Sequence, residues 1–127
     1  MTADEFDKLV QGAYGRIPGE FRERLRNVAM LVEAEPSAAQ LAEAGVGPGG
    51  TLLGLYQGRP LTHRSVFESF TMPDRITIFQ GPHERLAHGE AHLNQMVEAT
   101  VWHEVAHYFG MDEDQVRAAE RERAKPG

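Results

Sequence analysis

The sequence contains no cysteine among its 127 residues. Disulfide bonds, thiolate metal sites and cysteine nucleophiles are therefore all excluded. A bound metal ion would have to be held by histidine and carboxylate side chains, and the chain offers six histidines and 19 acidic residues for this purpose.

A long apolar run is also missing. No stretch approaches the roughly 20 apolar residues that a membrane-spanning helix needs. The first ten residues contain three acidic side chains and lack the basic and apolar regions of a secretory signal. We therefore expect a cytoplasmic protein with no membrane partner.

The chain has no concentration of basic residues. Its 13 basic residues are outnumbered by 19 acidic ones, which gives a formal net charge of -6. Several of the bases alternate with acids, as at Arg22, Glu23 and Arg24. A nucleic-acid-binding face needs clustered basic residues, so we expect no nucleic-acid partner.

The composition is that of an ordinary folded domain, with 41% hydrophobic and 25% charged residues. A chain of 127 residues lies in the usual size range of one domain. We expect residues 1–127 to form a single domain. The sequence makes no prediction of the oligomeric state.

Hydrophobic periodicity predicts helices and three strands in the first two thirds of the chain. Apolar residues at helical spacing predict an amphipathic helix over 3–14, and a short charged helix is predicted over 20–26. Ser37 can cap a short helix that reaches Ala44, and the glycine-rich residues 45–50 predict a loop. Short apolar runs predict three strands, the first of them buried: 28–32, 51–56 and 75–79.

The last third of the chain is predicted to be helical. From Pro82 to Lys125 it contains no further proline. Apolar residues between 96 and 109 surround almost the whole circumference of one helix, which predicts that this helix lies buried in the core. Mixed helices and strands followed by a helical region favour an α+β fold.

The buried helix contains the run His103-Glu104-Val105-Ala106-His107. Residues four apart differ by only about 40° around a helix axis, so both imidazoles leave one face and can bind one metal ion. Glu104 is offset from His103 by about 100°, which places its carboxylate beside the ion, where it can deprotonate a metal-activated water. The pattern predicts one zinc ion, two histidine ligands and Glu104 as the general base of a hydrolase.

Catalytic zinc sites commonly use three protein ligands, so a third is required. Gly110 can adopt a positive φ, end the helix and turn the chain beneath the metal, which would bring Glu113 to the ion. Glu113 could instead pair with Arg117 on a last helix. Asp112 and Asp114 are rival carboxylates, although Asp112 resembles the first residue of a capping box for that helix.

The remaining histidines are predicted to have other roles. His83, His88 and His92 are unevenly spaced, which favours surface or helix-lining positions over metal binding. His63 lies in the irregular segment between the second and third strands, where no pattern places it near the motif helix. Tyr56 and His63 are candidates for a group that stabilises an oxyanion, but no pattern assigns that role.

From His103 to Glu113 the sequence resembles the zincin superfamily of metallopeptidases in its extended form. Metzincins carry histidine as the third ligand and a later methionine-containing turn, whereas here the residue is Glu113 and fourteen residues follow it. A closer resemblance is to small bacterial proteins described as minimal zincin-like metallopeptidases, with an HExxHxxGxx(D/E) motif. It covers residues 21–116 and includes the blocks 52–58, 60–62, 64–65 and 73–78.

This resemblance implies a minimal zincin-like α+β fold, in which a small mixed sheet packs on a buried motif helix and a C-terminal helix follows. It also implies a zinc-dependent peptidase, with His103, His107 and Glu113 as zinc ligands and Glu104 as catalytic base. Members of that family often carry aspartate at the third ligand position, and Glu113 is one methylene longer.

We therefore expect a zinc metallopeptidase whose partner is a peptide or protein substrate. In other zincins an extended peptide lies along an edge strand, and we expect the strand at 75–79 to edge a cleft above the motif helix. Two alternatives remain: a metal-binding regulatory or interaction module without turnover, and a metal-dependent hydrolase of a non-peptide amide or ester. Two histidines and one carboxylate also suit iron.

Overall fold

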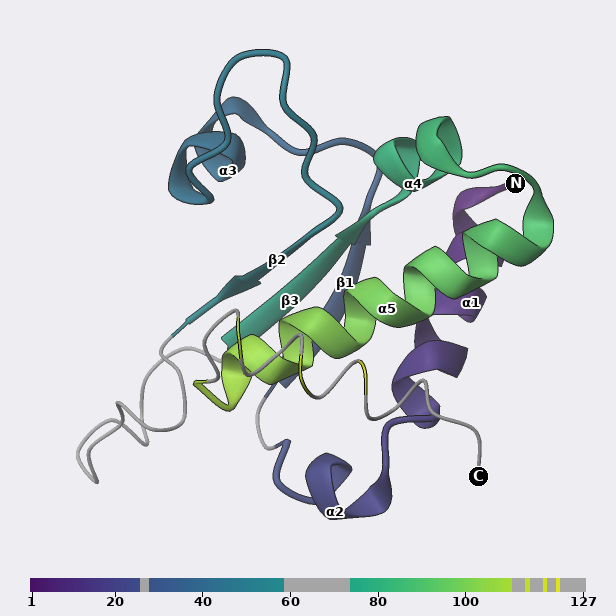
Figure 1. The fold of residues 1–127 in the computed structure, drawn as a ribbon, viewed down its shortest axis with the longest axis vertical. Helices are drawn as coiled ribbons and strands as arrows, with labels where there is room; N and C mark the ends of the chain where they lie inside the picture. Colours follow the sequence, from purple (N-terminus) through teal and green to yellow (C-terminus); the bar gives the residue numbers. More distant parts are fainter. Residues whose placement is uncertain (26–27, 59–73, 111–113, 115–117, 119–120, 122–127) are drawn as a thin grey trace.

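The computed structural model describes residues 1–25, 28–58 and 74–110 together with Asp114, Ala118 and Arg121 (Figure 1). The elements within these residues are α1 (Ala3–Gly15), α2 (Gly19–Arg22), β1 (Val28–Glu33), α3 (Ala38–Glu43), β2 (Gly54–Gln57), β3 (Asp74–Phe79), α4 (Gln80–Leu86) and α5 (Glu90–Tyr108). Helices and strands are mixed along the chain, which confirms the α+β class.

The three strands form a small mixed sheet in the order β1-β3-β2. β1 runs parallel to β3 with Val28 opposite Asp74, and β2 runs antiparallel to β3 with Gly54 opposite Ile78. β3 is therefore the central strand, and the prediction that residues 75–79 edge the cleft is wrong. β3 pairs with β1 on one side and with β2 on the other, so β2 is the edge strand that lies beside α5.

α1 and α5 lie side by side against one face of the sheet, and the hydrophobic core fills the space between these layers (Figure 1). Ile76 and Ile78 of β3 are fully buried on this face. α1 is amphipathic as predicted, since its buried residues are Phe6, Val10 and Ala13. Its N-terminus is fixed by a capping box between Thr2 and Glu5.

The motif helix α5 is buried around most of its circumference, as predicted. Its buried residues are Leu93, Val97, Thr100, Val101, Trp102, Glu104, Val105, Ala106 and Tyr108. This helix therefore has no broad solvent-facing side in its second half. Functional side chains on that half must face either the core or a recess.

Three predicted elements differ from those observed. β2 begins at Gly54 rather than at residue 51. β1 is an edge strand whose Leu31 is 39% exposed, so the prediction of a buried strand is wrong. α2 ends at Arg22 rather than at residue 26. By contrast, the predicted cap of α3 is confirmed, because the Ser37 side chain accepts from the Gln40 backbone amide and Gln40 reaches back to Ser37.

α4 and α5 are separate helices. Pro82 lies in the first turn of α4, where a backbone N–H has no helical partner in any case. Gly89, with φ of 107°, caps the start of α5 and permits the change of direction. None of the helices in the described part of the chain combines the length and apolar character that crossing a bilayer requires.

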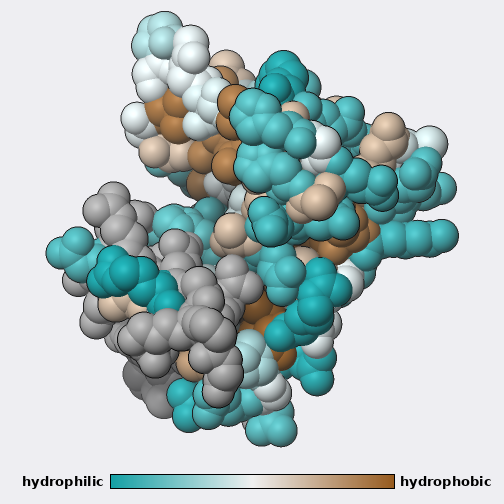
Figure 2. Space-filling model, turned by 45° about the vertical axis from the view of Figure 1, so that its right-hand side comes forward, coloured by the Kyte–Doolittle hydropathy of each residue, from teal (hydrophilic) through white to brown (hydrophobic). Residues whose placement is uncertain are grey.

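In the space-filling view most of the visible surface is hydrophilic (Figure 2). Apolar surface shows as separate patches between the hydrophilic residues, one of them in the upper part of the molecule (Figure 2).

Candidate metal centre

His103, Glu104 and His107 come together near the C-terminal end of α5. One potential ligand atom from each residue lies within 4.8 Å of those from the other two. The two imidazole ring centroids are 4.6 Å apart, so the one-turn spacing places both rings side by side. Two ring nitrogens and a carboxylate oxygen at this separation are compatible with binding a single metal ion.

The carboxylate of this cluster is the most protected of the three groups. Glu104 is only 6% exposed, whereas His103 and His107 are half-buried. One oxygen of Glu104 lies 3.3 Å from Nδ1 of His107, which can donate to it when that nitrogen carries a hydrogen. A buried carboxylate needs such a partner, so this contact also holds the acid in place.

β2 lies close to the cluster at Gly54. A Cβ atom at that position would lie 2.8 Å from Thr100 Cγ2, 3.1 Å from Glu104 Cγ and 3.3 Å from the backbone oxygen of Thr77. These separations are shorter than ordinary van der Waals contacts, so a side chain would force α5 and β2 apart. Gly54 thus allows the edge strand to pack directly over Glu104, a role that sequence reasoning missed.

The chain turns immediately after the motif helix. α5 ends at Tyr108, and Gly110 has φ of 77°, the left-handed conformation predicted for it. The Gly110 amide donates to the carbonyl of His107 at 2.9 Å. The turn predicted to lead toward a third ligand is therefore present. Glu113 and its rival Asp112 lie outside the described residues, and Asp114 is helical and exposed.

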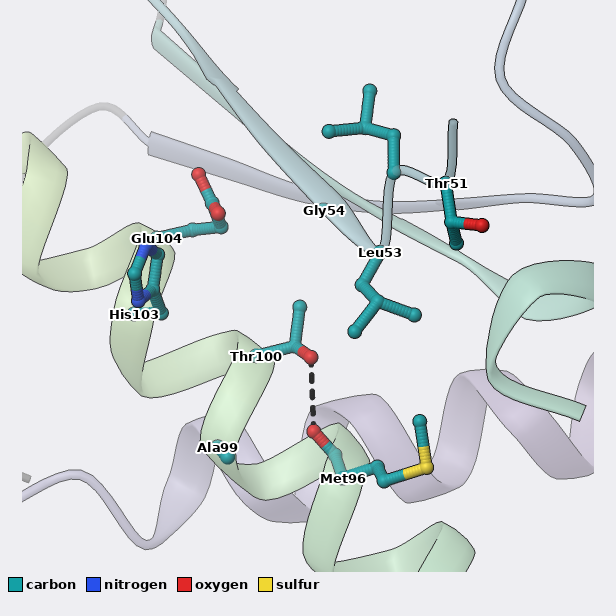
Figure 3. Close-up of a pocket in the computed structure, with 9 residues that line it drawn as sticks. Thr51, Leu53, Gly54, Met96, Ala99, Thr100, His103 and Glu104 are labelled. Carbon is teal, nitrogen blue, oxygen red and sulfur yellow. Dashed lines mark hydrogen bonds between the residues drawn. The ribbon is translucent and has the colours of Figure 1, made fainter. Parts of the chain in front are cut away.

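A cavity of about 410 Å³ adjoins the cluster (Figure 3). One wall is residues 51–54, which lead into β2. The other wall belongs to α5 and consists of Met96, Ala99, Thr100, His103 and Glu104. The cluster therefore lies beside an open recess large enough for a ligand.

Comparison with known proteins identifies the family of this chain. A model of the family described as zincin-like metallopeptidase matches residues 25–123, which is most of the chain. The chain belongs to the zincin-like metallopeptidase family. No curated protein matches this zincin-like chain.

Among the solved structures that resemble this zincin-like chain, one does so along nearly its full length. It is a conserved hypothetical protein from T. thermophilus, with 24% sequence identity and a TM-score of 0.56. The likeness covers 94% of this chain and 99% of that chain. At this level of identity the comparison supports the fold alone.

His83 has a structural role in the zincin-like fold. It is fully buried, so of the two predicted positions, on the surface or lining a helix, the surface position is wrong. Its Nδ1 lies 2.7 Å from the Phe79 carbonyl oxygen. Because a carbonyl oxygen can only accept a hydrogen bond, Nδ1 carries the ring hydrogen and donates it. Its Nε2 lies 2.9 Å from the Thr100 hydroxyl. His83 thus links α4 to the motif helix, and no local pattern predicts this contact.

Burial lowers the pKa of His83, and only the hydrogen bond to the Phe79 carbonyl opposes this effect. The unfolded chain, with a histidine pKa of about 6.5, therefore takes up a proton at higher pH than the native protein. We expect the free energy of unfolding to fall as the pH drops below about 6.5 towards the lowered pKa of His83. Denaturant titrations across this range should show a weaker decline for His83→Gln.

His88→Gln provides the matched control for that experiment, because His88 is exposed and is not one of the residues of the hydrophobic core. It should keep the pH dependence of the wild type. An equal decline in all three proteins would assign the acid sensitivity to other groups.

The remaining histidines and Tyr56, which the sequence also offered as candidates, are not placed in the cluster. His88 and His92 stack at 5.2 Å beside the N-terminus of α5, and the His88 amide donates to His92 Nδ1. The Tyr56 hydroxyl donates to the Asp74 carboxylate at 2.7 Å, so it is not assigned to an oxyanion. His63 lies outside the described residues.

Proposed function

We propose that this zincin-like protein is a zinc-dependent peptidase that acts on peptide or protein substrates. The observation that carries this proposal is the convergence of two imidazoles and a buried carboxylate within 4.8 Å beside a recess. These donors fit Zn²⁺, which prefers histidine nitrogen and carboxylate oxygen in the absence of cysteine. His103 and His107 would hold the ion, and Glu113 is the proposed third ligand.

Bound zinc would supply a Lewis acid and lower the pKa of water to about 7. Glu104 would accept the proton of the attacking water and return it to the leaving amine. Its burial against Gly54 keeps the carboxylate oriented and away from bulk water. β2 is an edge strand of the described sheet, so its backbone can pair with an extended peptide.

The metal site can be tested by zinc content. We expect protein purified without added metal to contain about one zinc per chain, because the donors form a single cluster. The double variant His103→Ala/His107→Ala should lose this zinc, since both imidazole ligands are removed. Elemental analysis by mass spectrometry would measure the metal content directly.

The chain offers a matched control with the same spacing. His88 and His92 are also four residues apart, and the double variant His88→Ala/His92→Ala should keep its zinc. Equal loss of zinc from both double variants would contradict the assigned site. Stoichiometric iron in place of zinc would overturn the choice of metal.

Turnover requires a separate assay. The zinc-loaded protein should cleave members of a diverse peptide pool, chelation should stop cleavage, and added zinc should restore it. A loaded protein that cleaves no peptide would refute the peptidase. If chelation then unfolds the chain, a metal-binding module is supported, and small amides and esters in the same screen would reveal a non-peptide hydrolase.

A further inference from the structure

The cavity beside the cluster has apolar walls. Met96 and Ala99 line it from α5, and Leu53 lines it from the segment before β2. The Leu53 side chain points toward α5 (Figure 3). Among the described residues that line the cavity, none is lysine or arginine, and Glu104 at one end is the acidic group. Such a surface favours an apolar occupant over a charged one, because removing a charge from water to lie against apolar side chains is unfavourable.

Thr100 lies between these apolar residues, but its hydroxyl is occupied within the protein. Its Oγ1 is 2.9 Å from the Met96 carbonyl (Figure 3, dashed line) and 2.9 Å from Nε2 of the buried His83. Its methyl group instead points toward Gly54. The one polar side chain in the middle of the helix wall therefore presents a methyl group to β2 and the cavity beside it.

The cavity is continuous with the proposed reaction site. His103 and Glu104 form part of its lining, while Met96 and Ala99 lie one to two turns earlier on the same helix. A peptide whose carbonyl reached Glu104 would have the side chain of a neighbouring residue close to these apolar walls. The volume of about 410 Å³ lies within the range of small-ligand sites and accommodates a large aliphatic or aromatic side chain.

We propose that this cavity selects an apolar side chain next to the bond that is cleaved, and that Leu53, Met96 and Ala99 determine the specificity. The proposal rests on the proposed peptidase function, since it assigns a substrate preference to that site. The free energy of removing a leucine-sized side chain from water corresponds to a ratio of roughly 10-fold to 100-fold between cleavage next to leucine and cleavage next to a polar residue.

Binding can be tested without turnover. The probe is N-acetyl-leucine amide, with N-acetyl-aspartate amide as the acidic comparison, added to the wild type and to Glu104→Gln. Methionine methyl groups labelled with ¹³C provide the signal, and Met96→Leu identifies the resonance of Met96. We expect the leucine amide to shift that resonance in both proteins and the aspartate amide to leave it unchanged.

Specificity can be tested by filling the cavity. Ala99→Leu should reduce cleavage next to large apolar residues by about 10-fold relative to cleavage next to alanine or valine, read from the products of a peptide pool. Ala91→Leu is the control, because it makes the same change at an exposed position of α5. Should Ala99→Leu fail to fold, Met96→Ala enlarges the cavity and should shift the preference toward aromatic residues.

The outcomes separate this proposal from the function on which it rests. Binding of the leucine amide at Met96 without any peptide cleavage would support the apolar site and overturn the peptidase. Cleavage that ignores the neighbouring side chain, with no leucine amide binding, would overturn the specificity proposal and leave the peptidase standing. Absence of both binding and cleavage would overturn both.

Discussion

Glu104→Gln is expected to slow peptide cleavage by several orders of magnitude while leaving the zinc content unchanged. Glutamine has nearly the same shape as glutamate, so the packing against Gly54 and the neighbouring imidazoles should survive. Its amide cannot accept a proton from water or return one to a leaving amine, and losing such a group typically costs about 10²-fold to 10⁴-fold in rate. Steady-state kinetics and elemental analysis on one preparation would measure both quantities.

Glu98→Gln is the matched control for this experiment. Glu98 lies on the same helix, but its carboxylate is partly exposed and forms an ion pair with Arg16 at 3.3 Å. Its replacement should leave both cleavage and zinc content near wild-type values, because surface ion pairs contribute little to stability. If Glu104→Gln loses its zinc, Glu104 is a ligand rather than a base, and if it cleaves normally the proposed mechanism is wrong.

Gly54→Ala should reduce both activity and stability. The added methyl group would meet Thr100 and Glu104 closer than van der Waals contact, so β2 and α5 must move apart. Inserting a methyl group into a filled space typically costs about 1–3 kcal/mol of unfolding free energy. A shift of Glu104 by about 1 Å can lower the catalytic rate by about 100-fold. Denaturant unfolding and kcat/KM would measure the two effects.

Gly47→Ala separates this steric effect from a general effect of glycine replacement. A Cβ at Gly47 would have no neighbouring heavy atom within 4 Å. This variant should therefore keep wild-type activity and stability. If Gly54→Ala behaves in the same way, the close approach of β2 does not position the proposed base.

The features that the sequence predicted correctly depend on local geometry. His103 and His107 come together because a helix repeats every 3.6 residues, and this proximity does not depend on the rest of the chain. Gly110 ends the motif helix for a reason that is also local, since glycine adopts positive φ readily. The cap at Ser37 depends on Gln40, three residues away.

The features that the sequence did not predict depend on contacts between distant segments. The alternation in residues 75–79 indicates a strand, but its central place in the sheet depends on pairing with β1 and β2. His83 is buried because Thr100, on the next helix, offers its ring a hydroxyl partner. The close contact at Gly54 likewise requires two elements that are far apart in the chain.

The roles of the site residues remain predictions that the experiments above address. Glu113 as third ligand rests on the motif and on the turn at Gly110. The position of the His103, Glu104 and His107 cluster on a buried helix, by contrast, is observed in the structure.

That position limits how the protein can diversify. On the second half of α5, residues of the core alternate with residues of the proposed site, so few substitutions there would be neutral for both packing and chemistry. Met96 and Ala99 are partly exposed and face the recess, which makes them the positions where directed evolution could change substrate preference at least cost to folding. α3 buries none of its residues, and drift among relatives should accumulate there first.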